Sequence, residues 1–142
     1  MPALTEAEAR ERFAAARVAR LATSGTTARP HLVPVVFALD GATVLMAVDH
    51  KPKRTTRLRR LAEIEANPAV CLLADHYEED WDRLWWVRAD GEARVLPGAA
   101  GSPEAERCTA LLGAKYEQYT GRPPAGPVIL VEVVRWSGWR AS

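Results

Sequence analysis

The chain has 142 residues, 48% of them hydrophobic and 26% charged, which is the composition of a single globular domain over residues 1–142. Its formal net charge is only +1, which argues against a general nucleic-acid-binding protein, because such domains are usually basic over a whole face. No apolar run approaches the roughly 20 residues needed to cross a bilayer, and the charged N-terminus lacks the apolar centre of a signal peptide, so we expect a cytoplasmic protein without a membrane partner.

The first 48 residues predict one helix followed by three strands: the helix covers Thr5–Ala16, and the strands cover Val18–Thr23, His31–Leu39 and Ala42–Val48. Thr5 and Glu8 can form a capping box at the start of the helix. Asp40 and Gly41 separate the last two strands, and this dipeptide is typical of a tight hairpin. Pro34 donates no backbone hydrogen bond, so its strand should be a sheet edge, carry a bulge or lie where another group approaches.

The remaining residues predict two more helices and three more strands. One helix covers Thr55–Ala66, and the other has an apolar face from Ala105 to Tyr119. The strands cover Ala69–Ala74, Leu84–Leu96 and Val128–Trp136. Asn67-Pro68 ends the first of these helices, because the residue before proline disfavours helical geometry. Gly91 predicts a bend or bulge in the long strand. The strands do not alternate regularly with helices, which favours an antiparallel barrel with helices outside it over a parallel sheet.

Six cations lie among the ten residues from 51 to 60, here called the cationic segment: Lys51, Lys53, Arg54, Arg57, Arg59 and Arg60. The segment joins a predicted strand to a predicted helix, where free backbone N–H groups and the helix dipole favour an anion. A solvated helix face is the ordinary explanation of a charge run. However, Pro52 places its neighbours in a loop, and a bound anion would relieve the repulsion between like charges. The sequence therefore indicates a phosphate-bearing ligand.

Five tryptophans in a chain of this size are explained most simply by packing in the core and in a dimer. Trp85 and Trp86 must face opposite sides of a strand, so one can be in the core while the other meets a partner subunit or a ligand. The three histidines show no metal-ligand spacing, and no metal site is expected. We identify no catalytic acid, base or nucleophile from the sequence.

The order of these segments resembles the flavin-binding split barrels related to pyridoxamine 5'-phosphate oxidase. The resemblance depends on Arg29-Pro30 and Pro34-Val35 within ARPHLVPVVFALDG, on the cationic segment, and on Asn67-Pro68 before the strand AVCLLAD. Within that family, VDHKPKRT, LRRL and RLWWVRADG are most similar to the actinobacterial branch predicted to use the 8-hydroxy-5-deazaflavin coenzyme F420. The resemblance implies a mainly β (α+β) fold: a six-stranded antiparallel split β-barrel with three flanking helices.

The resemblance also implies a homodimer with two symmetric cofactor sites at the subunit interface, each open to a small-molecule substrate. The ring of the coenzyme would lie against backbone groups of His31, Leu32, Val33, Pro34 and Val35. The adjoining wall of the site would be formed by Met46, Ala47, Val48 and Asp49. The phosphate would be held by Lys51, Lys53, Arg54 and Thr55, with Arg59 or Arg60 from the following helix. The ring would be covered from the partner chain by Trp136 and Trp139.

The combined interpretation is an F420-dependent oxidoreductase that transfers hydride between a deazaflavin and a small organic substrate. The coenzyme would supply the chemistry, and the protein would supply orientation and exclusion of water. Two alternatives remain open on the same barrel: an FMN-dependent oxidoreductase of the pyridoxamine-phosphate-oxidase type, and a non-enzymatic carrier of flavin or haem. The long run of cations favours F420, whose phosphodiester and oligoglutamate tail form a longer anion than the single phosphate of FMN.

Overall fold

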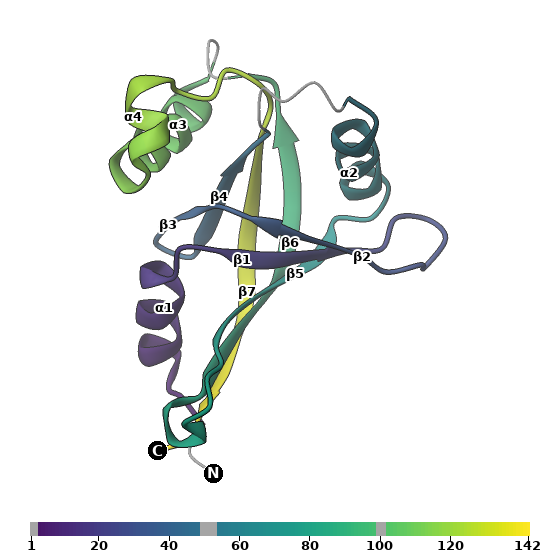
Figure 1. Cartoon of the computed structure of the whole chain (residues 1–142). Helices are drawn as coiled ribbons and strands as arrows, with labels where there is room; N and C mark the ends of the chain where they lie inside the picture. Colours follow the sequence, from purple (N-terminus) through teal and green to yellow (C-terminus); the bar gives the residue numbers. More distant parts are fainter. Residues whose placement is uncertain (1–2, 49–53, 99–101) are drawn as a thin grey trace.

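The computed structural model describes residues 3–48, 54–98 and 102–142 (Figure 1). The helices are α1 (Glu6–Ala15), α2 (Arg54–Ala66), α3 (Pro103–Lys115) and α4 (Glu117–Gly121), with a single 3-10 turn, η1 (Trp81–Arg83). The strands are β1 (Ala19–Thr23), β2 (His31–Val35), β3 (Ala38–Asp40), β4 (Thr43–Ala47), β5 (Ala69–His76), β6 (Trp85–Leu96) and β7 (Val128–Arg140). None of the helices in these ranges is long and apolar enough to cross a bilayer.

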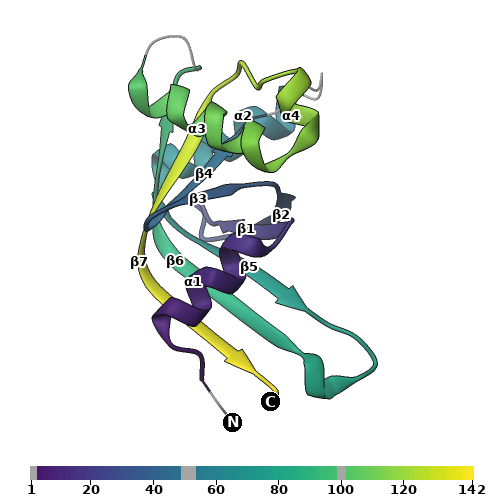
Figure 2. The same ribbon diagram turned by 90° about the vertical axis from the view of Figure 1, so that its left-hand side faces the viewer.

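The strands form one antiparallel sheet in the order β2-β1-β5-β6-β7-β4-β3. The sheet curls into a half-barrel, with α1 along it, α3 and α4 on one side, and α2 on the other (Figures 1 and 2). The predicted fold class, a mainly β antiparallel split barrel flanked by helices, is therefore confirmed. The described residues contain seven strands and four helices rather than six and three.

The extra strand arises because the predicted strand His31–Leu39 is two strands. β2 pairs with β1, whereas β3 pairs with β4, and the chain leaves the sheet between them at Val36 and Phe37. β2 is an edge of the sheet formed by the described residues, and Pro34 lies opposite Arg20 of β1. Of the three alternatives for Pro34, the structure shows the sheet edge, where its missing N–H removes no bond from an inner strand pair.

The buried backbone of Phe37 has its hydrogen bonds satisfied by Tyr116. The Phe37 N–H donates to the Tyr116 hydroxyl (3.1 Å), and the hydroxyl lies within donating distance of the carbonyl oxygens of Phe37 (2.9 Å) and Arg17 (3.0 Å). Tyr116 follows α3, whose last turn is capped there, and α4 begins directly after it. The predicted third helix is therefore two helices, because Tyr116 adopts extended backbone geometry.

The core lies inside the curl of the sheet. Phe13 of α1 and Phe37 are fully buried, with ring centroids 4.6 Å apart, and Ile64 of α2 closes the same core from the other side. The capping box predicted at Thr5 and Glu8 is confirmed, with both hydrogen bonds present. A second cluster joins α3 to β4 and β7, so each helix in the described residues is held by an apolar contact with the sheet or with a neighbouring helix.

Candidate functional site

The split of the barrel lies between β2 and the end of β4. The register of β3 with β4 pairs Ala38 with Leu45, and its continuation would place Val35 opposite Val48. Instead, β2 turns to β1, so β4 beyond Leu45 pairs with β7 alone among the described strands. β2 on its outer side, and the end of β4 on the side away from β7, therefore present backbone groups that no second strand of the described chain engages. We call this opening the split edge (residues 31–35 and 46–47).

At the split edge, several side chains predicted to contact the ring are buried. Met46 is 1% exposed, and Val35 and Val48 are also buried in the core. A ligand can therefore reach these positions only through backbone atoms, as predicted for the second strand. The Val48 N–H already donates to the carbonyl of Pro127 (2.9 Å), and the Met46 carbonyl lies 3.7 Å from the Cys108 thiol.

The other side chains of β2 alternate between two faces of the strand. Leu32 and Pro34 are exposed on the outer face, whereas His31 and Val33 are half-buried on the inner face. Ala47 is half-buried and packs against the α3 cluster. The strand thus offers a ligand its free backbone edge together with two exposed apolar side chains, Leu32 and Pro34.

The cationic segment begins before α2 and continues through the first half of this helix. Asp49, Lys51 and Lys53 lie outside the described residues, and Arg54 and Thr55 form the start of the helix. Arg59 is 60% exposed, with its Nε 3.8 Å from the Glu63 carboxylate, while the Nε of Arg60 is buried. The first turn of α2 contains no acidic residue, whereas α1 and α3 each have two.

The C-terminal half of α2 holds the loop between β1 and β2. The Asn67 side-chain amide donates to the Ser24 hydroxyl (2.9 Å) and lies 3.4 Å from the Gly25 carbonyl. Gly25 has a φ of +62°, and a Cβ there would lie 3.1 Å from the Glu63 side chain. Glu63 also lies 3.2 Å from His31 Nδ1. Sequence reasoning missed Glu63; the available signal was a carboxylate one turn after the paired arginines Arg59 and Arg60.

Trp136 and Trp139 lie on opposite faces of β7. Trp136 pairs with Ala89 on the inner face and packs edge-to-face on Phe13, with ring centroids 5.3 Å apart. Trp139 pairs with Trp86 on the outer face. The structure therefore does not bring the two predicted aromatic covers together: Trp136 belongs to the packing under α1, and only Trp139 is directed away from the core.

Trp139 lines an aromatic groove of about 380 Å³ at the ends of β5, β6 and β7, with Leu73, Asp75, Tyr77, Leu84, Trp85, Trp86 and Arg88. The prediction that Trp85 and Trp86 face opposite sides is confirmed: Trp85 packs on the core, and Trp86 shares the outer face with Arg88. Arg88 pairs with Asp90 (3.1 Å). The strand ends that line this groove lie at the end of the molecule where both termini lie, away from α2 (Figure 1).

The outer face of the sheet exposes apolar side chains between the split edge and the groove. Leu32 of β2 is 65% exposed, and Leu73 of β5 is partly exposed. Cys71 lies between them on β5, and burial, helped by the Asp90 carboxylate, raises the pKa of its thiol. This outer face continues into the aromatic groove, so it exposes apolar side chains next to the ion pairs Arg20–Asp75 and Arg88–Asp90.

Titratable side chains near these features are paired rather than clustered. His31 lies beside Glu63, and His76 beside Glu78, which Arg83 also approaches (3.7 Å). Within the described ranges, no three His, Cys, Asp or Glu side chains gather where they could hold a metal ion.

Solved structures share this fold. A FAD-binding protein of Mesorhizobium loti has a TM-score of 0.76 at 20% identity, covering 99% of this chain and 98% of that one. The haem storage protein HutZ of Vibrio cholerae has a TM-score of 0.71 at 16% identity, covering 95% and 93%. A FAD-binding protein of Mycobacterium smegmatis has a TM-score of 0.64 at 19% identity, covering 99% and 98%. At these identities the likeness shows the fold alone.

A search of curated proteins found no match to this chain. The family model described as pyridoxamine 5'-phosphate oxidase matches residues 5–140, which include every helix and strand given above. Because the match covers nearly the whole sequence and the curled antiparallel sheet agrees with it, the chain belongs to the pyridoxamine 5'-phosphate oxidase family.

Proposed function

We propose that this protein binds a flavin-type coenzyme at the split edge and acts as an F420-dependent oxidoreductase on a small organic substrate. The observation that carries the proposal is the start of α2. Negative charge is favoured at a helix N-terminus, and α1 and α3 place Glu6, Glu8, Glu104 and Glu106 there. α2 has no such residue and begins inside the cationic segment, so its N-terminus is left for an anion supplied by a ligand.

The anionic part of the coenzyme would be held by Lys51, Lys53, Arg54 and Thr55, with Arg59 further along the helix. Charge-assisted hydrogen bonds from Lys and Arg to phosphate are among the stronger polar contacts in proteins. The cations continue past the first turn of α2, and a strip of this length suits a phosphodiester and carboxylate tail better than one phosphate. This supports F420 over FMN.

The ring would lie along the split edge. Unpaired backbone N–H and C=O groups of an edge strand are donors and acceptors ready for a partner, and the polar edge of a flavin or deazaflavin ring carries both kinds of group. Leu32 offers an apolar contact beside it. A bound deazaflavin supplies two-electron hydride transfer, and the protein's part is then to orient the ring and substrate and to exclude water.

We further propose that the active form is a homodimer. The outer face exposes Leu32 and carries the tryptophan-lined groove, and exposed apolar side chains that gather on one face are a feature of interaction sites. In a two-fold dimer each copy presents the same surface to the other. The aromatic groove lies at the opposite end of the sheet from α2, so Trp139 and Trp86 would reach the coenzyme bound to the partner rather than their own.

A second candidate is a carrier that holds a flavin or haem without turnover. Two observations favour it: the split edge carries no nucleophile and its one imidazole–carboxylate pair, His31 with Glu63, is shut off from solvent, and the haem storage protein of Vibrio cholerae shares the fold. Adding reduced F420 with a panel of enones and quinones distinguishes the two. Substrate-dependent reoxidation of the coenzyme supports the oxidoreductase, and stable binding without turnover supports the carrier.

Titration of the purified protein with F420 and with FMN tests the anion site. The double variant Lys53→Glu/Arg54→Glu should weaken coenzyme binding at least about 100-fold, because it replaces two attractive contacts with repulsion. Arg122→Glu, an exposed change beyond α4 on the other side of the barrel from α2, should bind as the wild type does. Unchanged affinity in the double variant, with its fold intact by circular dichroism, would show that the anchor lies elsewhere.

A further inference from the structure

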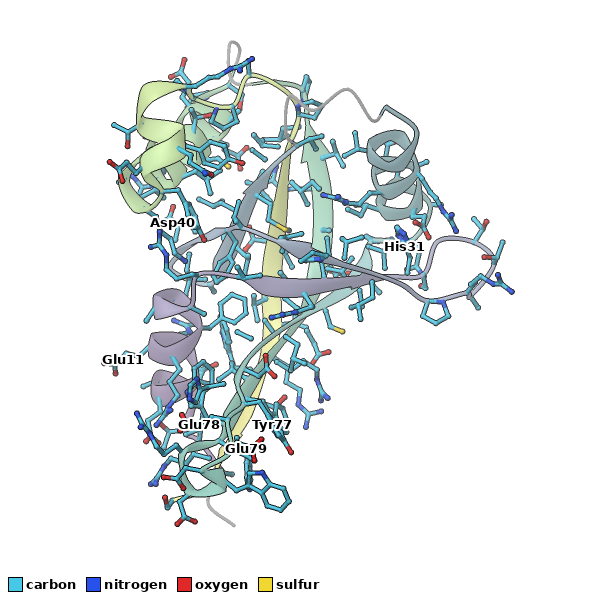
Figure 3. The ribbon with its side chains drawn as sticks, viewed as in Figure 1. Glu11, His31, Asp40, Tyr77, Glu78 and Glu79 are labelled. Atoms are coloured by element: carbon cyan, nitrogen blue, oxygen red, sulfur yellow. The ribbon has the colours of Figure 1, made fainter. Side chains whose placement is uncertain are left out.

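Glu63 is a largely buried carboxylate that a guanidinium and an imidazole both approach. Its side chain is 14% exposed, and the same oxygen, Oε1, lies 3.2 Å from His31 Nδ1 and 3.8 Å from Arg59 Nε. His31 reaches it from β2, on the side of the strand that faces α2 (Figure 3). Arg59 lies one turn earlier on the same helix. One oxygen thus connects the split edge with the cationic segment.

Neither contact satisfies that oxygen fully. Glu63 Oε1 and His31 Nδ1 are both shut off from solvent, and their 3.2 Å contact lacks the alignment of a hydrogen bond. Arg59 stands farther away and is mostly exposed. A buried carboxylate without a good partner is costly, so Glu63 should hold whichever cation remains beside it.

We infer that Glu63 is a positioning residue that couples capture of the coenzyme's anionic tail by Arg59 to protonation of His31. The inference rests on the proposed function, in which Arg59 contacts that tail. When the tail draws Arg59 away, Glu63 keeps one neighbour, and its negative charge favours the imidazolium form of His31. The imidazole takes one proton from solvent, and no other bond changes. Coenzyme binding and proton uptake then reinforce each other.

The surroundings leave few other groups to produce this effect. α2 packs against β1 and β6, whose inner positions carry Leu21, Thr23 and Ala93, and none of the described inner positions of these two strands is charged. The charged side chains of these strands are on the outer face, in the ion pairs Arg20–Asp75 and Arg88–Asp90, or at Glu92 and Arg94, of which Arg94 pairs with Glu104.

The remaining neighbours are Arg60, one turn before Glu63, and Arg29 in the loop before β2. Lysine and arginine keep their charge between about pH 6 and pH 8, so they add a constant field. His50 precedes the cationic segment in the sequence and lies outside the described residues. Histidine is the side chain that can change its charge in this pH range. His50→Gln is therefore a necessary control.

The expected result is coenzyme affinity that rises as the pH falls from about 8 to about 6, by up to about tenfold per pH unit. Glu63→Gln removes the competing carboxylate, so it should bind at least as tightly as the wild type at pH 8 and lose the pH dependence. His31→Gln should also lose the dependence, and His50→Gln should keep it. Asn67→Ala loosens the loop between β1 and β2 without removing the Glu63 carboxylate, so it should also keep the pH dependence.

Calorimetric titration with F420, or with FMN if only FMN binds, measures the protons directly when repeated in buffers of different ionisation enthalpy. Wild type, His50→Gln and Asn67→Ala should take up a fraction of a proton, up to about one, per coenzyme. Glu63→Gln and His31→Gln should take up none. A proton NMR titration of His31 with and without coenzyme gives the same answer without a variant: binding should move its titration to higher pH.

Binding without proton uptake by the wild type would overturn this inference alone. So would proton uptake that survives in Glu63→Gln, or weakened binding in Glu63→Gln with the wild-type pH slope, since these point to a purely structural side chain. Failure of the wild type to bind either coenzyme would instead remove the proposed function, and this coupling with it.

Discussion

Tyr116 supplies the hydrogen bonds that allow the chain to leave the sheet between β2 and β3. Its hydroxyl serves both the N–H and the carbonyl of Phe37, a residue with no exposed surface. Burial raises the pKa of Tyr116, so the hydroxyl stays protonated and remains a donor. Without this hydroxyl, the N–H and the carbonyl of Phe37 would be buried without hydrogen-bond partners where the chain passes from β2 to β3.

Tyr116→Phe should lower the free energy of unfolding by about 1–3 kcal/mol, the usual cost of leaving buried polar groups without partners. Urea denaturation followed by tryptophan fluorescence measures the change. Tyr77→Phe removes a hydroxyl from a mostly exposed side chain and should leave the midpoint unchanged. Equal effects of the two substitutions would mean that Tyr116 contributes packing rather than hydrogen bonds.

At the scale of elements, the bend in β6 and β7 depends on one glycine. The register of the two strands shifts between Asp90 and Gly91, which leaves Val134 without a partner across the ladder. A Cβ on Gly91 would lie 2.3 Å from the carbonyl oxygen of Glu132, closer than any side chain allows. The irregularity predicted at Gly91 is found there, but β6 is not interrupted, and the extra residue, Val134, belongs to β7. This bulge bends the strand pair so that the sheet can curl.

Gly91→Ala should therefore destabilise the protein by at least about 2 kcal/mol, because two backbones must move apart. Gly121→Ala is the matched control: it lies at the end of α4 with no atom within 4 Å of its Cβ, and it should be neutral or slightly stabilising. Thermal unfolding of both variants decides the matter. A Gly91→Ala protein as stable as the control would show that the strands tolerate a wider bulge.

At the scale of the whole molecule, the outer face of the sheet exposes apolar side chains beside two ion pairs. Leu32 lies at the split edge, and Trp86 and Trp139 lie at the other end of the same face. The proposed dimer would cover this face and bring the aromatic groove of one copy to the coenzyme of the other. Coenzyme binding and dimer formation should then depend on each other.

Leu32→Glu should shift the dimer toward monomer, since it places a charge within the apolar surface to be buried. Sedimentation velocity at several protein concentrations measures the shift. Glu11→Lys, on the exposed face of α1 (Figure 3), changes the net charge on a different side and should leave the dimer intact. A Leu32→Glu protein that still sediments as a dimer would place the interface elsewhere.

The sequence by itself determined the local features of this protein. The capping box at Thr5, the edge position of Pro34, the bulge at Gly91 and the cationic entry to α2 all followed from a few adjacent residues. Each depends on backbone chemistry, such as a missing N–H, a missing Cβ or an orphan helix donor, that acts wherever the residue stands.

Only the tertiary structure decided how distant segments meet. It divided the predicted strand His31–Leu39 at Phe37, placed Trp136 and Trp139 on opposite faces, and brought Glu63 against His31. These outcomes depend on the curl of the sheet and on which segment supplies a hydrogen bond or a buried contact across it. Pairings of this kind are set by packing between residues far apart in the chain, and no spacing within the sequence encodes them.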